Sequence, residues 1–156
     1  MRDRAGLNED FRDMLESLLE AGVDFVVVGA HALAFHGLPR ATGDIDIFVR
    51  PSKENAARVV RALHAFGAPL AAHGVTEADF STEGTVYQLG LPPRRIDLLT
   101  AIDGVSFEEA WADRVVSTRD GLDLSFLSRE ALLRNKRAAA RPKDLADVEA
   151  LEKQGT

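Results

Sequence analysis

Residues 25–49 read FVVVGAHALAFHGLPRATGDIDIFV. A run of four apolar residues leads directly into Gly29, a short helical pattern follows, and two aspartates then alternate with isoleucines. Side chains along a strand alternate between its two faces, so Asp44 and Asp46 project from one face and the isoleucines from the other. The segment therefore predicts a strand, a helix and a second strand that carries two neighbouring carboxylates.

The two aspartates favour a divalent-metal site. Carboxylates this close repel each other unless a cation or protons lie between them. Hard cations such as Mg²⁺ take oxygen ligands, often one or two carboxylates together with substrate phosphates. The alternative is a surface strand with two solvated aspartates. Aspartate disfavours strands, however, and the isoleucine, phenylalanine and valine around the pair indicate a strand embedded in the core.

Gly29 adds a place for phosphate. A helix that begins at once after a strand presents free backbone N–H groups and the positive end of its dipole, and both favour an anion. Glycine also lets a ligand approach the backbone closely. Taken alone, a glycine after a buried strand more often marks only a tight turn. Beside the acid pair, it favours a metal site that handles a nucleotide.

A third carboxylate would complete a two-metal site, and Asp97 is the best candidate. It is a lone acid inside the predicted strand RIDLL at 95–99. Asp103 precedes a glycine, which is typical of a turn residue, and Asp123 has less apolar surroundings. Two ions about 3.5–4 Å apart clamp the attacking and leaving oxygens in such sites. Asp97 could hold one ion and accept a proton from an attacking hydroxyl.

Basic residues that could neutralise a triphosphate cluster near the C-terminal end. The cluster comprises Lys136, Arg137, Arg141 and Lys143, and Arg40 precedes the acid pair. The alternative for each is a solvated surface cation.

Two histidines, His31 and His36, lie near the predicted site. Neither has the spacing of a metal-binding histidine pair. We therefore expect both to be structural histidines whose polar atoms are satisfied.

The bulk properties indicate a soluble globular chain. Its 156 residues suit one domain at 1–156, with the core at about 24–150 and an N-terminal helix at 8–21. The chain has no cysteine, which excludes disulfides, thiolate metal sites and cysteine nucleophiles. The net charge of −6 argues against broad nucleic-acid affinity. No apolar run approaches the roughly 20 residues of a membrane span, and the first residues lack a signal-peptide core, so we expect a cytoplasmic protein with no membrane partner.

The pattern along the chain predicts a mixed α/β fold. The predicted helices cover 8–21, 30–35, 51–66, 107–111, 128–140 and a last segment from Pro142, and the predicted strands cover 24–28, 44–49, 86–91, 95–100, 114–117 and 122–127. Residues 67–85 are expected to form a loop with short turns. Leu145, Val148 and Leu151 predict the apolar face of the last helix. Helices mixed with hairpins favour an α+β arrangement, a mixed sheet flanked by helices, over a regular parallel array.

Several of these segments resemble the nucleotidyltransferase superfamily. They are Gly29-Ala30, the segment RATGDID at 40–46 and the lone acid of Ile96-Asp97-Leu98. The segments LRNK at 133–136 and RPKDLAD at 141–147 also resemble the closing part of one subgroup. That subgroup is the small bacterial and archaeal type, which includes minimal nucleotidyltransferases and the AbiEii-like toxins of toxin–antitoxin systems. The resemblance covers roughly residues 24–150.

The resemblance implies a nucleotidyltransferase-like fold, two Mg²⁺ ions and a nucleoside triphosphate such as ATP. By analogy, Asp44, Asp46 and Asp97 bind the metal and form the catalytic set, with Asp97 as the base. The implied nucleotide-binding residues are Gly29, Ala30, Arg40, Thr42, Lys136 and Lys143. The superfamily usually has Gly-Ser or Gly-Gly where this chain has Gly29-Ala30. Alanine keeps the backbone donor and lacks the hydroxyl, so we expect a weaker phosphate contact.

The leading hypothesis is Mg²⁺-dependent transfer of a nucleoside monophosphate to a hydroxyl of an acceptor. The acceptor is an RNA such as tRNA, a protein or a small molecule, and a partner subunit or homodimer would supply its surface. By family analogy the chain is a candidate toxin–antitoxin component. The alternatives are a catalytically inactive nucleotide-binding or regulatory module of the same fold, and a metal-dependent glycosyltransferase, although such domains are generally much longer.

Overall fold

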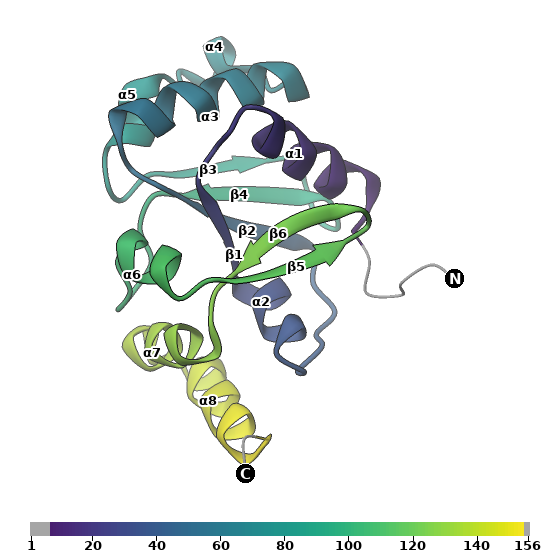
Figure 1. Cartoon of the computed structure of the whole chain (residues 1–156), viewed down its shortest axis with the longest axis vertical. Helices are drawn as coiled ribbons and strands as arrows, with labels where there is room; N and C mark the ends of the chain where they lie inside the picture. Colours follow the sequence, from purple (N-terminus) through teal and green to yellow (C-terminus); the bar gives the residue numbers. More distant parts are fainter. Residues whose placement is uncertain (1–6, 155–156) are drawn as a thin grey trace.

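A computed structural model of the chain describes residues 7–154, and within them six strands form one mixed sheet (Figure 1). The strands are β1 (Phe25–Val28), β2 (Asp44–Val49), β3 (Val86–Leu89), β4 (Arg95–Leu99), β5 (Val115–Arg119) and β6 (Leu122–Phe126). The helices are α1 (Glu9–Glu20), α2 (Gly29–Phe35), α3 (Lys53–Phe66), α4 (Leu70–His73), α5 (Glu77–Ser81), α6 (Phe107–Ala112), α7 (Arg129–Ala139) and α8 (Pro142–Gln154). The predicted mixed sheet flanked by helices is confirmed.

The strand order in the sheet is β3-β4-β2-β1-β6-β5. β1 is antiparallel to β2 and parallel to β6, whereas β2 is parallel to β4. The two predicted hairpins, β3–β4 and β5–β6, are both present as antiparallel pairs. The sheet therefore combines local hairpins with longer connections that bring β1, β2 and β4 together at its centre.

Helices cover both faces of the sheet (Figure 1). One face packs against α1, α3 and the short helices that follow α3, and the other packs mainly against α6, α7 and α8. The alternation along β1 divides its side chains between these layers, with Phe25 and Val27 in the first and Val26 and Val28 in the second. A strand buried on both faces explains why 25–28 is a continuous apolar run.

Local signals explain where several helices begin and end. The side chains of Ser52 and Ser128 accept hydrogen bonds from the first turns of α3 and α7, as expected for N-caps. Ala140 has a left-handed φ of 55° at the end of α7, and Pro142 begins α8 two residues later. This tight break folds α8 back against α7, and both helices lie beside the same face of the sheet.

Two expectations are wrong. Residues 67–85 are not a plain loop, because α4 and α5 form there and bury Leu70 and Phe80 in the core. A reciprocal capping box begins α5, which packs against α3. On α8, Leu145 is 50% exposed, while Asp144 and Asp147 face inward with Val148 and Leu151. The two inward acids pair with cations of neighbouring segments. Ion pairs, rather than burial of apolar side chains, therefore determine which side of this part of α8 faces inward.

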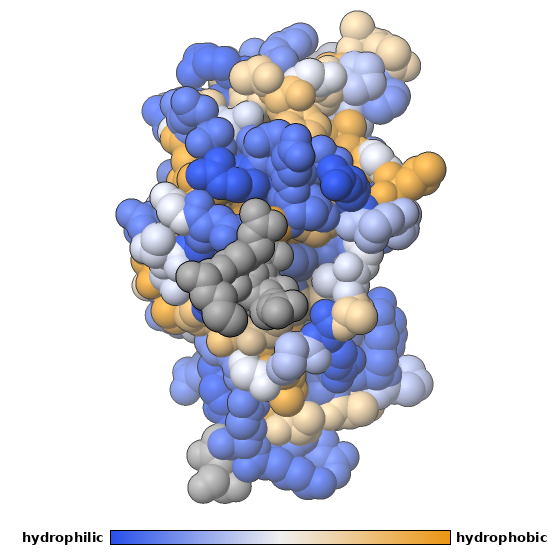
Figure 2. All heavy atoms as spheres, turned by 90° about the vertical axis from the view of Figure 1, so that its right-hand side faces the viewer, coloured by the Kyte–Doolittle hydropathy of each residue, from blue (hydrophilic) through white to orange (hydrophobic). Residues whose placement is uncertain are grey.

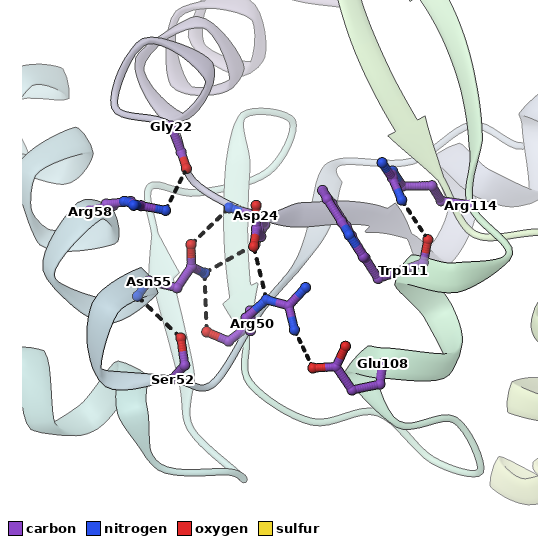
Figure 3. A network of polar contacts seen from close by, with 9 residues as sticks. All are labelled: Gly22, Asp24, Arg50, Ser52, Asn55, Arg58, Glu108, Trp111 and Arg114. Atoms are coloured by element: carbon purple, nitrogen blue, oxygen red, sulfur yellow. Dashed lines mark hydrogen bonds and ion pairs between the residues drawn. The ribbon is translucent and has the colours of Figure 1, made fainter.

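A network of hydrogen bonds and ion pairs lies at the end of the sheet where β1 begins (Figure 3). The buried amide of Asn55 accepts from the Asp24 backbone N–H at 2.8 Å and donates to the backbone oxygens of Asp24 and Arg50, both at 3.1 Å. The Arg50 guanidinium donates to the Asp24 carboxylate at 2.9 Å and pairs with Glu108 of α6. The network joins β1, β2, α3 and α6 at the end of the sheet remote from Asp44 and Asp46.

The surface on the side of the β3–β4 turn is mostly hydrophilic, with hydrophobic residues in separate patches (Figure 2). Leu91 in that turn and Val86 at the sheet edge are 79% and 57% exposed. Across residues 7–154, no helix has the length and apolar character needed to span a bilayer.

Candidate active site

Three aspartates converge where β1, β2 and β4 meet. The antiparallel register of β1 and β2 places Val28 opposite Asp46, and the parallel register of β2 and β4 places Asp46 opposite Asp97. Asp44 lies on the same face of β2, two residues before Asp46. Carboxylate oxygens of the three aspartates lie within 4.8 Å of one another. The sheet therefore assembles an acid cluster, defined here as Asp44, Asp46 and Asp97.

Burial and mutual repulsion disfavour ionisation in this cluster. Burial, followed by the charges of Asp44 and Asp97, raises the pKa of Asp46 from 3.8 to about 7. Burial is also the main cause of the raised pKa of Asp97, a residue that is 5% exposed. The protein thus holds three carboxylates in a place where their negative charges cost free energy unless more positive charge is added nearby.

Arg95 supplies part of that positive charge, and sequence reasoning did not place it in the site. Its Nη2 donates to Asp44 Oδ2 at 2.6 Å, and its Nε lies 3.3 Å from Asp97 Oδ1. Arg95 lies opposite Asp44 in the sheet and two residues before Asp97 on β4, so all three side chains share one face. The sequence signal that could have placed Arg95 in the site is its position two residues before Asp97 on the predicted strand.

The donor set fits a hard divalent cation. All the candidate ligand atoms are carboxylate oxygens, which Mg²⁺ and similar ions prefer. Asp97 Oδ1 is buried and receives no hydrogen bond from the part of the chain that the structure describes. A single guanidinium faces three carboxylates, so the cluster retains capacity for more positive charge.

Gly29 faces the acid cluster at the start of α2. Its φ is +66°, a left-handed conformation that glycine adopts without steric cost. A Cβ at this position would collide with Asp46 Oδ2 and lie 3.0 Å from Asp46 Cγ. Gly29 is therefore more than a turn residue, because the absence of a side chain lets the Asp46 carboxylate lie against the first turn of α2.

A cleft of about 530 Å³ opens over the acid cluster, and its lining comes from β2, β4, α2, α7, α8 and the loop before β2. All the residues predicted to bind metal or nucleotide line this cleft: Gly29, Ala30, Arg40, Thr42, Asp44, Asp46, Asp97, Lys136 and Lys143. Residues far apart in the sequence thus form one continuous surface, with the acid cluster and Arg95 on the sheet side and Lys136 and Lys143 on the α7–α8 side.

Two buried acids, Asp144 and Asp147, hold the cations of this cleft in place. Lys136 Nζ lies 3.0 Å from Asp147 Oδ2 and 3.6 Å from Asp144 Oδ1. Arg141 Nε donates to Asp144 at 2.6 Å, and the Arg40 guanidinium pairs with Asp147. Burial raises the pKa of Asp144, but hydrogen bonds from Arg141 and the charges of Arg141 and Lys136 outweigh it and leave that pKa lowered.

These two acids are the residues of the cleft that sequence reasoning missed on α8. They are 1% and 2% exposed, and their separation of three residues places both on the inward side of the helix. The paired cations Lys136, Arg40 and Arg141 are held by the protein, whereas Lys143 is exposed on the first turn of α8. The Thr42 hydroxyl donates to Asp44 Oδ1 at 2.8 Å, which orients that carboxylate.

The prediction for the two histidines is right for His36 and wrong for His31. The His36 Nε2 lies 2.7 Å from the Leu127 backbone oxygen. The His31 Nε2 is buried and has no hydrogen-bond partner among the described residues. Burial lowers the pKa of His31 although Asp44 opposes this shift, and the imidazole ring packs edge-on against Phe11 at 5.6 Å.

The fold and the cluster together define a class. A D-x-D pair on one central strand, a third aspartate on the parallel neighbour and a glycine-initiated helix facing them are features of nucleotidyltransferases. A family model described as "Nucleotidyltransferase of unknown function (DUF6036)" matches residues 6–153, and the chain belongs to this family.

The fold is similar to that of a solved structure. It is the crystal structure of a Thermotoga maritima protein that is provisionally described as a nucleotidyltransferase, with 19% sequence identity and a TM-score of 0.56. The alignment covers 92% of this chain and 89% of that chain. At this identity the likeness concerns the fold. A search of curated protein sequences finds no match.

Proposed function

We propose that the protein transfers a nucleoside monophosphate from a nucleoside triphosphate to a hydroxyl group of an acceptor, in a reaction that depends on Mg²⁺. The observation that carries this proposal is the acid cluster, which faces Gly29 at the base of a cleft with cations on its other side. Membership of a nucleotidyltransferase family supports the reaction class.

In this proposal Asp44, Asp46 and Asp97 hold two Mg²⁺ ions. Bound there, the ions would polarise phosphoryl oxygens and offset the charge that develops during transfer. Thr42 orients Asp44 through its hydrogen bond. Asp97 accepts the proton of the attacking hydroxyl, because its carboxylate lies within the acid cluster beside the reacting centre.

The triphosphate would lie between the start of α2 and the cations of α7 and α8. Ala30 offers its backbone N–H, and Lys136 and Arg40 offer charges already oriented by Asp147. Such prior orientation lowers the reorganisation needed when the phosphates bind. Lys143 is exposed at the rim of the cleft and is placed to neutralise the terminal phosphate.

Thermal unfolding with each nucleoside triphosphate, with and without Mg²⁺, tests the nucleotide site. A ligand present at 100 times its Kd adds about 2.7 kcal/mol of stability. We expect a Mg²⁺-dependent shift in the wild type that Asp44→Asn loses and Asp123→Asn, an exposed change on β6, keeps. Absence of any shift with all nucleotides would refute the proposal.

A second candidate function is a nucleotide-binding module without turnover. The ion pairs of Arg95 with Asp44 and Asp97 favour it, because they engage oxygens that a metal would need. The missing hydroxyl at Ala30 points the same way. This candidate would be supported if the protein binds nucleotide but releases no pyrophosphate with any acceptor that is tested. The glycosyltransferase alternative receives no support from the family match.

Four predictions from the sequence stay proposals. These are the AbiEii-like toxin subtype, the partner subunit or homodimer, the cytoplasmic location and the single domain at 1–156. Co-expression with the protein encoded by the neighbouring gene, followed by a growth assay, tests the toxin role. Growth arrest that the neighbour relieves would support it, and unchanged growth on expression of the active enzyme would refute it.

A further inference from the structure

A second hollow of about 720 Å³, the side pocket, adjoins the cleft. Its walls come from α1, α2, the loop before β2 and the turn before β4, and they include Phe11, His31, Pro39, Pro93 and Arg94. The volume is in the range of pockets that hold small organic ligands, about 300–1,000 Å³. The proposed function assigns nothing to it.

The side pocket is continuous with the cleft. Ala30, Arg40, Ala41 and Thr42 line both hollows. Thr42 hydrogen-bonds Asp44, so a ligand that contacts Thr42 from the side pocket lies next to the acid cluster. A group placed there is within reach of the reacting centre.

The described lining of the side pocket excludes the two helices that carry the cations assigned to the leaving group. Transfer to an oxygen nucleophile requires the attacking and leaving oxygens to be roughly in line across the phosphorus. The cations suited to the leaving pyrophosphate, Lys136 and Lys143, come from α7 and α8. No described residue that lines the side pocket belongs to either helix. A hydroxyl entering from the side pocket would thus approach from a wall other than the one that holds the terminal phosphates in the proposed function.

We infer that the side pocket is the acceptor site and that the acceptor is a neutral, largely apolar small molecule bearing a hydroxyl. This inference rests on the proposed function. In the step, the acceptor oxygen forms a bond to the α-phosphorus and the bond to the oxygen that bridges the α- and β-phosphates breaks. Pyrophosphate leaves, and the hydroxyl proton passes to Asp97.

The lining of the pocket determines this chemical class. Phe11, Pro39 and Pro93 present apolar surface, and the described lining contains no carboxylate that could bind a polycation. The described lining holds two cations: Arg40, which the proposed function assigns to the triphosphate, and Arg94, which pairs with Asp10 at 3.3 Å. A nucleic-acid acceptor needs several cations for its phosphates, so this wall does not suit RNA.

His31 provides the polar contact in this apolar wall. Its Nε2 is buried and has no partner in the described chain, a state that costs free energy until a ligand supplies one. The ring is held edge-on against Phe11, and it lines the pocket beside the residues shared with the cleft. A rotation of the ring that exposes this nitrogen to the side pocket would let His31 hydrogen-bond the acceptor hydroxyl and select hydroxyl-bearing ligands.

The test uses 1-naphthol as a probe, with naphthalene as its counterpart without a hydroxyl. Amide NMR titration of the full chain should shift residues of the side pocket with 1-naphthol and not with kanamycin or an RNA ending in CCA. Ala34→Trp, which fills the pocket from α2, should lower the affinity for both aromatic probes at least tenfold and leave the Mg²⁺·ATP thermal shift unchanged. His31→Leu should weaken 1-naphthol by up to about tenfold and leave naphthalene unaffected, the loss expected for one hydrogen bond.

Failure of the inference differs from failure of the proposed function. Shifts elsewhere, an affinity that Ala34→Trp does not change, or binding of kanamycin or RNA in this pocket would overturn the acceptor class while the Mg²⁺·ATP shift still stands. An equal loss for naphthalene in His31→Leu would overturn the selective role of His31. A missing Mg²⁺·nucleotide shift would instead refute the nucleotide site, whatever 1-naphthol does.

Discussion

Asp46→Asn keeps the size of the side chain and removes one carboxylate from the acid cluster. In the wild type this carboxylate lies against Gly29 and faces Asp44 and Asp97. Its ionisation is costly because of burial and these neighbouring charges, which raise its pKa to about 7. We therefore expect the metal-free variant to be more stable than the wild type at neutral and alkaline pH.

The expected gain follows from linkage between ionisation and folding. The pKa of Asp46 is about 7 in the folded protein against 3.8 ordinarily, so the folded state holds the proton more tightly. The stability that the protonated Asp46 side chain supports is fully present below about pH 4, and it is lost progressively as the pH rises to about 7. At 1.36 kcal/mol per pKa unit, the raised pKa lowers the free energy of unfolding by at most about 4 kcal/mol at pH 8, and by about 2 kcal/mol at pH 5, where the folded protein still holds the proton.

Urea unfolding of the wild type and Asp46→Asn, with a chelator present, measures this difference at both pH values. Asp123→Asn is the matched control, because it makes the same change on an exposed strand position and should alter stability by less than about 0.5 kcal/mol. Adding Mg²⁺ should then stabilise the wild type more than Asp46→Asn. Equal stability of the two proteins at pH 8, or a gain that does not depend on pH, would refute the electrostatic account of the cluster.

Three further predictions concern the same cluster and its supports. Gly29→Ala should lower the free energy of unfolding by more than Gly22→Ala does. Both glycines have a left-handed φ, but only Gly29 would place a Cβ against the Asp46 carboxylate. A loss of about 1 kcal/mol in both variants would mean that only the backbone conformation, and not the collision with Asp46, contributes. Arg95→Met should destabilise the metal-free protein and enlarge its thermal shift with Mg²⁺, because a competing cation is removed; an unchanged or smaller shift would contradict this. Asn55→Ala should lower the free energy of unfolding in urea by about 1–3 kcal/mol, because it leaves buried backbone groups unpaired. The variant should keep the thermal shift with Mg²⁺ and nucleotide. Loss of that shift would show that the network of Figure 3 also shapes the cleft.

Local patterns were sufficient for most of the fold. The apolar run before Gly29, the helix after it and the alternation around Asp44 and Asp46 are short-range signals, and the structure forms β1, α2 and β2 there. The lone acid in the strand at 95–99 was also informative, because an unpaired carboxylate in a buried strand needs a partner. The register of β2 with β4 places Asp97 beside Asp46.

Contacts between distant elements were not predictable from the same patterns. The helical period of Leu145, Val148 and Leu151 indicated one apolar face, but Asp144 and Asp147 take part of the inward side because they bind cations from other segments. The helices at 70–73 and 77–81 are short, so their periodicity is weak, and the burial of Leu70 and Phe80 in the core stabilises them.

The sequence by itself determined the order of the elements and the types of residue that meet in the cleft, because strand and helix periods and N-caps act within a few residues. Only the tertiary structure decided which charges neighbour one another: that Arg95 lies among the acids, that two buried aspartates orient the cations, and that His31 faces a side pocket with its Nε2 unpaired. The physical reason is that burial and Coulomb energy depend on distances between segments far apart in the chain, and those distances exist only once the sheet and its helices have packed.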